Sequence, residues 1–291
     1  MSVLVEILSP SFLLRDALYN ALVIGFLCPL VGVYLVLRRM IFLAVALPQV
    51  SAAGIAFAFL GYALLYHAHQ HGGAAERALA LSGSISFTLV ALLVLAALEG
   101  KSVYSAESRI GATYALATSL TFLFLASDPS GEAQMVNILK GDILAATHES
   151  LIVLTITYGL VGLFIVKFSR QLLLISFDRD LAKVFRLPVR AWDTALYLCI
   201  GLVIGVGVMS AGPLVIFGFL TLPPLAARAI TKHMTTFSLV ASLIGGISAF
   251  TGFYLSYALD LPLGPAEVTL LGFVLVVTLA VKRGLLAWKT R

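Results

Sequence analysis

The feature that most constrains this chain is a series of long apolar runs that recurs from one end to the other. A helix needs about 20 apolar residues to cross a hydrocarbon core roughly 30 Å thick. Hydrophobic residues make up 60% of the 291 and charged residues only 11%, whereas a soluble domain has roughly 25% charged residues. One soluble core cannot bury so much apolar surface, so an all-α, multi-pass membrane protein is expected. The apolar runs lie at 17–37, 41–66, 79–98, 110–127, 150–167, 193–211, 213–230, 237–257 and 266–282.

These runs predict about nine spans, or eight if the short join at 38–40 or at 210–213 does not separate two spans. With the amino terminus outside and the carboxyl terminus inside, only Arg15, Arg77 and Lys140 of the 19 Lys and Arg residues lie outside. This distribution satisfies the positive-inside rule. No low-complexity linker or internal repeat is evident, so a single transmembrane domain over residues 1–291 is predicted, in the cell (inner or plasma) membrane.

The first ten residues lack the basic region and small-residue cleavage site of a secretory signal, so no removal is expected. The formal charge of +5 comes from basic residues at the ends of apolar runs, which form no continuous basic face. Nucleic acid is therefore not an expected partner. Cys28 and Cys199 each lie inside an apolar run without metal-site spacing, and are expected to be small buried hydrophobes.

The longest connection on the predicted cytoplasmic side runs over residues 168–192. Within it, residues 178–186 have the pattern of a short amphipathic helix, which Ser176 or Asp178 can cap and which must end before Pro188. Such a helix suits docking to a partner, and equally suits lying on anionic lipid. Its apolar residues are Leu181, Val184 and Phe185, and its basic residues are Arg179, Lys183 and Arg186.

No G-x-x-x-x-G-K-S/T motif occurs, so this chain is not expected to hydrolyse ATP by P-loop chemistry. The spans also lack the paired carboxylates or carboxylate–histidine relay of a proton-coupled carrier. These two absences favour a transport subunit that is not itself an enzyme and whose energy source is another polypeptide. An autonomous channel or secondary carrier remains the alternative.

Several stretches resemble the membrane permeases of zinc-, manganese- and iron-type ABC importers. The resemblance implies a homodimer that binds cytoplasmic nucleotide-binding ATPase subunits and is served by an extracytoplasmic solute-binding protein. ATP and Mg²⁺ would be held by the ATPase, with no cofactor in this chain. It also implies that the amphipathic segment docks on the ATPase, with Asp178, Arg179, Leu181, Lys183, Val184 and Phe185 as coupling residues; we therefore call residues 168–192 the coupling segment. The stretches lie at 32–43, 54–57, 141–144, 172–182, 187–190, 212–215, 222–228 and 254–262.

The chain departs from this resemblance where those permeases usually supply an aspartate and, four residues later, a histidine as metal ligands. Val45 and Gln49 occupy these positions. Valine offers no ligand and glutamine only a neutral oxygen, so the usual metal site cannot be carried over. Pro48 frees the carbonyl of Ala44, which with Gln49 and Ser51 could face a polar path. The solute is then a metal chelate, an ion held by neutral oxygens or a small organic molecule, while bonding to neighbouring helices is the other interpretation of Gln49 and Ser51.

Three further features of the sequence concern metal binding, helix packing and the charge at a helix end. His67, His69 and His71 lie at the outer end of the second run and could collect a metal ion, or simply belong to a polar loop. The small residues of 201–207 predict close helix packing. Glu267, two residues after Pro265, is expected in the first turn of the last span, where a helix amino terminus stabilises a negative charge.

Overall fold

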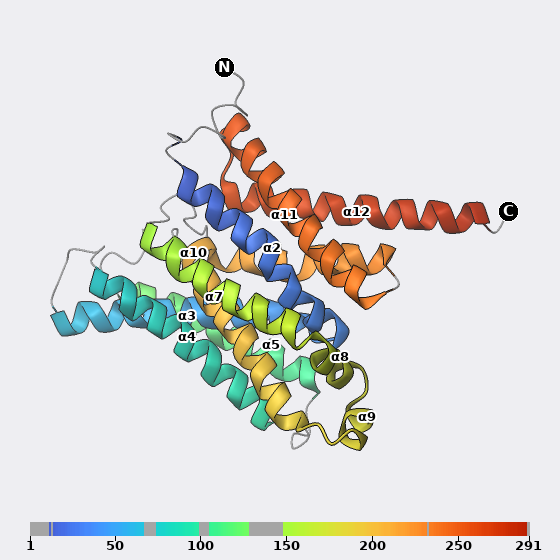
Figure 1. Cartoon of the computed structure of the whole chain (residues 1–291). Helices are drawn as coiled ribbons and strands as arrows, with labels where there is room; N and C mark the ends of the chain where they lie inside the picture. The colour runs from blue at the N-terminus through green and yellow to red at the C-terminus, as the bar shows by residue number, and fades with distance from the viewer. Residues whose placement is uncertain are drawn as a thin grey trace.

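The computed structural model describes residues 12, 14–66, 74–98, 105–127, 148–231 and 233–289. Every regular element in these ranges is a helix (Figure 1). The predicted all-α class is confirmed. The helices are α2 (Arg15–Leu37), α3 (Ile41–Tyr66), α4 (Ala74–Ala97), α5 (Ala106–Ala126), α7 (His148–Lys167), α8 (Ser169–Phe177), α9 (Arg179–Val184), α10 (Val189–Ile230), α11 (Met234–Leu259) and α12 (Leu263–Lys289).

Eight of the described helices are long and apolar enough to cross a membrane. One of them, α10, has 42 residues and contains a break at Gly212, whose φ of 81° and ψ of 164° suit glycine alone. Pro213 follows the break and cannot donate a helical hydrogen bond. The yellow and orange halves of α10 run in different directions (Figure 1). The break lies where the runs 193–211 and 213–230 were separated, and the count of nine and the orientation stay predictions.

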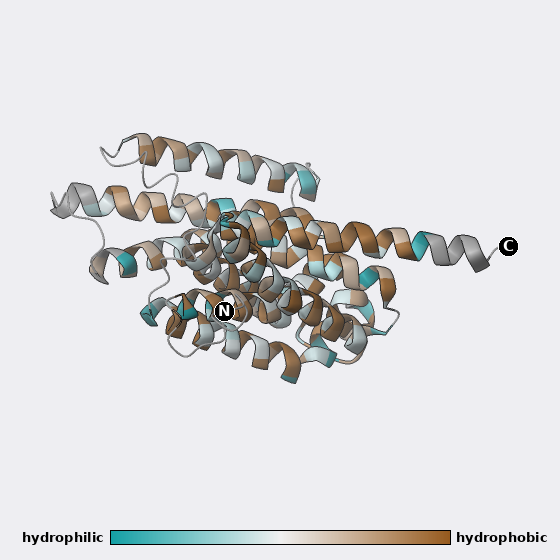
Figure 2. Cartoon of the chain, turned by 90° about the horizontal axis from the view of Figure 1, so that it is seen from above, coloured by the Kyte–Doolittle hydropathy of each residue, from teal (hydrophilic) through white to brown (hydrophobic). Residues whose placement is uncertain are grey.

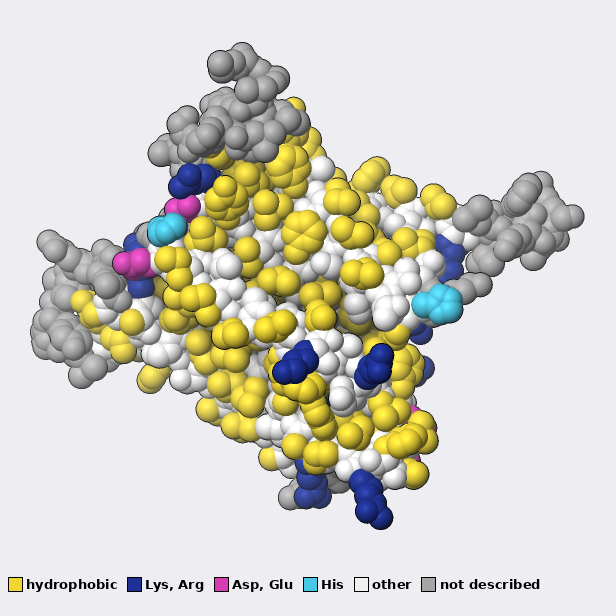
Figure 3. Space-filling model, in the orientation of Figure 1, with side chains coloured by type: hydrophobic (Ala, Val, Ile, Leu, Met, Phe, Trp, Pro, Cys, Tyr) yellow, Lys and Arg dark blue, Asp and Glu magenta, His cyan; other side chains and the backbone are white. Residues whose placement is uncertain are grey.

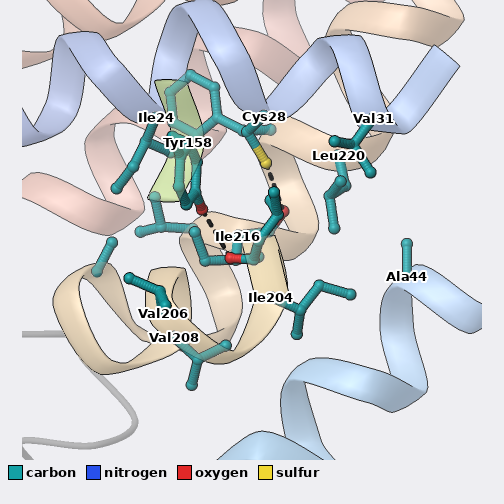
Figure 4. Packing of buried hydrophobic residues seen from close by; sticks show 14 of the residues in the cluster. Ile24, Cys28, Val31, Ala44, Tyr158, Ile204, Val206, Val208, Ile216 and Leu220 are labelled. Carbon is teal, nitrogen blue, oxygen red and sulfur yellow. Dashed lines mark hydrogen bonds between the residues drawn. The ribbon is translucent and has the colours of Figure 1, made fainter. Parts of the chain in front are cut away.

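The helix α10 lies at the centre of the bundle, packed against α2, α3, α4, α7, α11 and α12. Both cysteines are buried and free, as predicted. Figure 4 shows how tightly the core is built, with the Cys28 sulfur 4.0 Å from the carbonyl oxygen of Ile216. The Tyr158 hydroxyl of α7 donates to the carbonyl of Val203 at 2.8 Å. The core therefore joins α2, α7 and both halves of α10.

Small residues allow several pairs of helices to cross closely. A Cβ atom on Gly205 of α10 would lie 3.0 Å from Ile85 of α4, and one on Gly201 would lie 2.7 Å from Leu89. The close packing predicted for residues 201–207 is therefore confirmed within the chain. The α3–α4 crossing is tighter still, because a Cβ atom on Gly54 would overlap the carbonyl oxygen of Gly83.

The outer surface of the bundle is largely apolar (Figures 2 and 3). Exposed leucine, valine and phenylalanine side chains follow one another along α7 and α12. In water such a surface would drive aggregation, whereas in a bilayer it meets lipid tails. The chain is thus a multi-pass membrane protein. Basic side chains occur at the lower end of the view, where α8 and α9 lie, and also at the left and right edges (Figures 1 and 3); we call the lower end of the bundle the α9 end.

The prediction that Glu267 lies in the first turn of the last span is wrong. The helix α12 begins at Leu263, so Glu267 lies beyond its first turn, and the side chain is completely buried against Gly252 of α11. Neither carboxyl oxygen has a hydrogen-bond partner in the structure that is described. The helix amino terminus therefore does not account for this residue.

Candidate functional site

The four substrate-path candidates lie within two turns of α3 and do not share one face. Ala44 and Ser51 are completely buried, and Ala44 belongs to the same apolar cluster as Ile204 of α10 (Figure 4). Val45 and Gln49 are partly exposed and lie one turn apart. The structure therefore places Val45 and Gln49 on one side of the helix and turns the other two candidates into the bundle.

Ser51 belongs to a buried chain of hydrogen bonds that joins three helices. Its Oγ lies 2.6 Å from the Oγ of Ser84 on α4, and Ser84 donates to the carbonyl oxygen of Gly205 on α10 at 2.7 Å. Hydrogen bonds of this kind hold membrane helices together because lipid offers no competing partner. In this conformation Ser51 is completely buried and its hydroxyl contacts protein.

Pro48 does not interrupt α3, which is one helix from Ile41 to Tyr66. The Ala44 residue whose carbonyl Pro48 leaves without a helical donor is wholly buried. The freed carbonyl is thus not open at the surface of the chain. Of the polar groups expected along a path, the side chain of Gln49 is the one that the structure leaves accessible on this stretch.

The outer histidines His67, His69 and His71 lie outside the described residues, and their metal-collecting role stays a prediction. His148 at the start of α7 is described, and its Nδ1 lies 3.7 Å from a carboxyl oxygen of Asp16 on α2. Within the described ranges, no group of three or more His, Cys, Asp or Glu side chains could hold a metal ion.

The predicted amphipathic segment is a capped helix. The Asp178 carboxylate accepts from the backbone N–H groups of Asp180 and Leu181, at 3.0 and 2.9 Å, and so begins α9. Arg186, with φ of 56°, ends it as the following Leu187 N–H donates back to the Ala182 carbonyl. The Lys183 ammonium donates to Asp180 at 2.8 Å, and this contact lowers the pKa of the Asp180 carboxyl. Of the two predicted caps, Asp178 is the one that is used.

Within the part of the chain that the structure describes, the apolar side of α9 is largely uncovered. Leu181, Val184 and Phe185 are 44%, 77% and 65% exposed, whereas Ala182 is completely buried. Ala182 therefore packs against the bundle, whereas the three large apolar side chains face away from it. A short exposed helix with this pattern offers an apolar contact surface to another molecule.

A cavity of about 640 Å³ opens between the coupling segment and the start of α3. Met40 and Leu43 line one wall, and Asp178 and Asp180 line another. Arg38 also borders it: the guanidinium Nη1 lies 2.7 Å from a carboxyl oxygen of Asp193 on α10, and its Nε donates to the Ser176 hydroxyl at 3.0 Å. The residue patterns showed Arg38 only as a basic residue between two runs, because its partners lie far away in the sequence.

The profile of the ABC 3 transport family matches residues 11–282. This match extends over both the α3 stretch and the coupling segment. The chain belongs to the ABC 3 transport family.

Relatives of this ABC 3 family member cover nearly its whole length. It is 26% identical over 267 residues to the manganese import system permease protein ScaB of Streptococcus gordonii, covering 91% of this chain and 90% of the relative. It is 25% identical over 288 residues to the probable iron transport system membrane protein of Haemophilus influenzae, covering 98% and 96%. A chain in the structure of PsaBC from Streptococcus pneumoniae in complex with Fab shares the fold, with a TM-score of 0.78, 23% identity and coverage of 92% and 91%. The resemblance inferred from the sequence motifs is confirmed.

Proposed function

We propose that this chain is the permease subunit of an ABC importer for a divalent metal ion or a metal-containing solute. The observation that carries the proposal is the similarity over nine tenths or more of the chain to permeases named for manganese and iron transport. Membership of the ABC 3 transport family supports it.

The proposed assembly is a homodimer of this chain with two cytoplasmic ATPase subunits and an extracytoplasmic solute-binding protein. The exposed apolar side chains of α9 support an ATPase contact, since nothing in the described part of the chain covers them. ATP-driven closure of the ATPase subunits would push or pull α9 and reorient the spans around a central path. The chain does no chemistry on the solute.

The ATPase contact can be tested by a charge on α9. Val184→Asp is expected to abolish co-purification with the ATPase subunit, because it places an unpaired charge in an apolar interface. Ile230→Asp on α10 is the control, since Ile230 is also exposed, at 55%, but lies outside the coupling segment. Retained co-purification of Val184→Asp, or equal loss in both variants, would contradict docking through α9.

The nature of the solute depends on Val45 and Gln49, which provide no charged ligand. Within the proposed function this pair favours a chelated metal over a bare transition-metal ion, and a small organic solute is the second candidate. We would measure ATPase activity of the reconstituted complex with its binding protein against free Mn²⁺, Fe²⁺ and Zn²⁺, chelated metals and small organic solutes. Stimulation by a free metal supports uptake of the ion through other ligands, and stimulation only by a chelate supports a metal-containing solute. Stimulation only by an organic solute supports the second candidate.

The contribution of Gln49 can be measured in the same complex. Gln49→Leu is expected to lower solute-stimulated ATPase activity and uptake without loss of folded protein. The reason is that Gln49 is partly exposed, whereas Ala44 on the same helix is buried. Unchanged uptake would remove Gln49 from the path. Transport by the lone chain in liposomes would instead favour an autonomous channel or carrier.

A further inference from the structure

Arg38 is a buried arginine that joins three parts of the fold at the α9 end. Its side chain is only 6% exposed. The guanidinium is paired with Asp193 near the start of α10 and donates to Ser176 in the last turn of α8. Ser176 comes two residues before Asp178, the cap of α9. The contact with Asp193 is an ion pair without hydrogen-bond geometry, and the contact with Ser176 is a hydrogen bond from Nε, so the planar guanidinium contacts both partners at once.

The backbone around Arg38 is a tight corner between α2 and α3. The Met40 N–H donates to the Leu35 carbonyl at 2.9 Å, and the Arg39 N–H donates to the Val36 carbonyl at 3.2 Å. Arg39 has φ of 58°, the left-handed conformation that ends a helix in this motif. Only residues 38–40 separate the two helices, so a displacement of Arg38 moves the first turn of α3 with it.

Direct packing offers little other connection between the coupling segment and α3. The described contacts of α8 are with α2, α7, α9 and α10, and those of α9 are with α8 and α10. The 640 Å³ cavity lies between α9 and the start of α3. The two helices thus make little direct contact, and movement of the coupling segment reaches α3 either through α10 or through the α2–α3 corner at Arg38.

We propose that Arg38 is a positioning residue that transmits movement of the coupling segment to α3, the helix that carries Val45 and Gln49. When the ATPase displaces α9, Ser176 and Asp193 displace the guanidinium, and the α2–α3 corner follows as a rigid unit. The cavity provides room for this displacement. The role in transport rests on the proposed function, whereas the mechanical link itself is a property of the lone chain.

The link can be tested first without any partner. Spin labels on Phe42→Cys of α3 and Val184→Cys of α9 occupy positions that are 59% and 77% exposed, and the native cysteines are buried. The distance distribution between the labels is expected to be narrow in the parent and about twice as broad in Arg38→Gln, because the two elements then move independently. Ser176→Ala removes the Nε contact while Arg38 keeps its charge partner, and is expected to broaden the distribution less.

Thr194→Ala is the matched control, because among the described residues its exposed hydroxyl donates only to the Arg190 carbonyl of its own helix. Equal widths in the parent, Ser176→Ala and Thr194→Ala would overturn the link even if Arg38→Gln does not fold. Parent-like widths in a folded Arg38→Gln would overturn it as well.

The second test uses the complex with ATPase subunits and binding protein, with Mn²⁺ as the probe solute. Arg38→Gln is expected to keep ATP hydrolysis while the Mn²⁺ carried per ATP falls about fivefold or more, the size of an ordinary coupling between sites. An unchanged ratio overturns transmission through Arg38. If the parent binds no ATPase, the proposed function fails, and the spin-label result still decides whether Arg38 joins the two elements.

Discussion

Gly54→Ala is the sharpest test of the helix packing around the candidate path. A methyl group at Gly54 would lie 2.8 Å from the carbonyl carbon of Gly83 and 2.9 Å from the Cβ of Phe87. Favourable contacts between carbon atoms begin at about 3.5 Å, so α3 and α4 must separate by about 0.7 Å. Ser51 and Ser84 lie within one turn of these glycines, and the separation therefore also stretches their hydrogen bond.

The expected cost has two parts. Overpacking of a tight crossing costs about 1–3 kcal/mol, and each weakened membrane hydrogen bond adds about 0.6 kcal/mol. Against this cost, the higher helix propensity of alanine stabilises the folded chain by about 1 kcal/mol relative to glycine. Gly61→Ala on the same helix provides the control, since within the described structure no atom lies within 4 Å of its added methyl group. The helix-propensity gain is common to both variants, so their free energies of unfolding should differ by about 2 kcal/mol.

The assay is SDS-induced unfolding of the purified chain in mixed micelles, followed by tryptophan fluorescence. Gly54→Ala should unfold at lower SDS than the parent, and Gly61→Ala at the same or higher SDS. Equal stability of the two alanine variants would refute the reasoning, because it would mean that α3 and α4 do not cross at Gly54 and Gly83 as closely as the structure shows.

Three further predictions use the same preparation. Tyr158→Phe removes the hydroxyl that donates to the Val203 carbonyl and should lower the free energy of unfolding by about 1 kcal/mol; an unchanged value would contradict the bond. Glu267→Met keeps an unbranched side chain against Gly252 but removes two buried oxygens that lack described partners, and should raise stability by about 1–3 kcal/mol; a loss would show that the carboxyl group has a polar partner or bound cation. Asp178→Ala removes the cap of α9 and should cost that helix about 1 kcal/mol, seen as faster amide exchange of Asp180 and Leu181; exchange at the parent rate would show that the cap is dispensable.

The positions of the long apolar helices, and a short helix within residues 178–186, could be predicted from residue patterns alone, whereas α8 was not predicted. Each apolar run coincides with a described helix and passes its end by at most one residue, because the cost of placing a segment in lipid depends mainly on its own composition. Gly212 and Pro213 mark the break in α10 for a similarly local reason. Gly212 permits the positive φ that the break requires, and Pro213 has no N–H group to donate to a helical hydrogen bond. Asp178 could be predicted as a cap because it acts on the next three residues.

The sequence by itself thus determined an all-helical membrane chain and the presence of the short amphipathic helix α9. Only the tertiary structure decided that Ala44 and Ser51 turn inward while Val45 and Gln49 stay partly exposed. It also decided that Arg38 pairs with Asp193 and Ser176, and that Glu267 is buried. The physical reason is that spans apolar on all sides carry no pattern to say which face packs inward. That choice depends on how helices distant in sequence fit together at their small and polar residues.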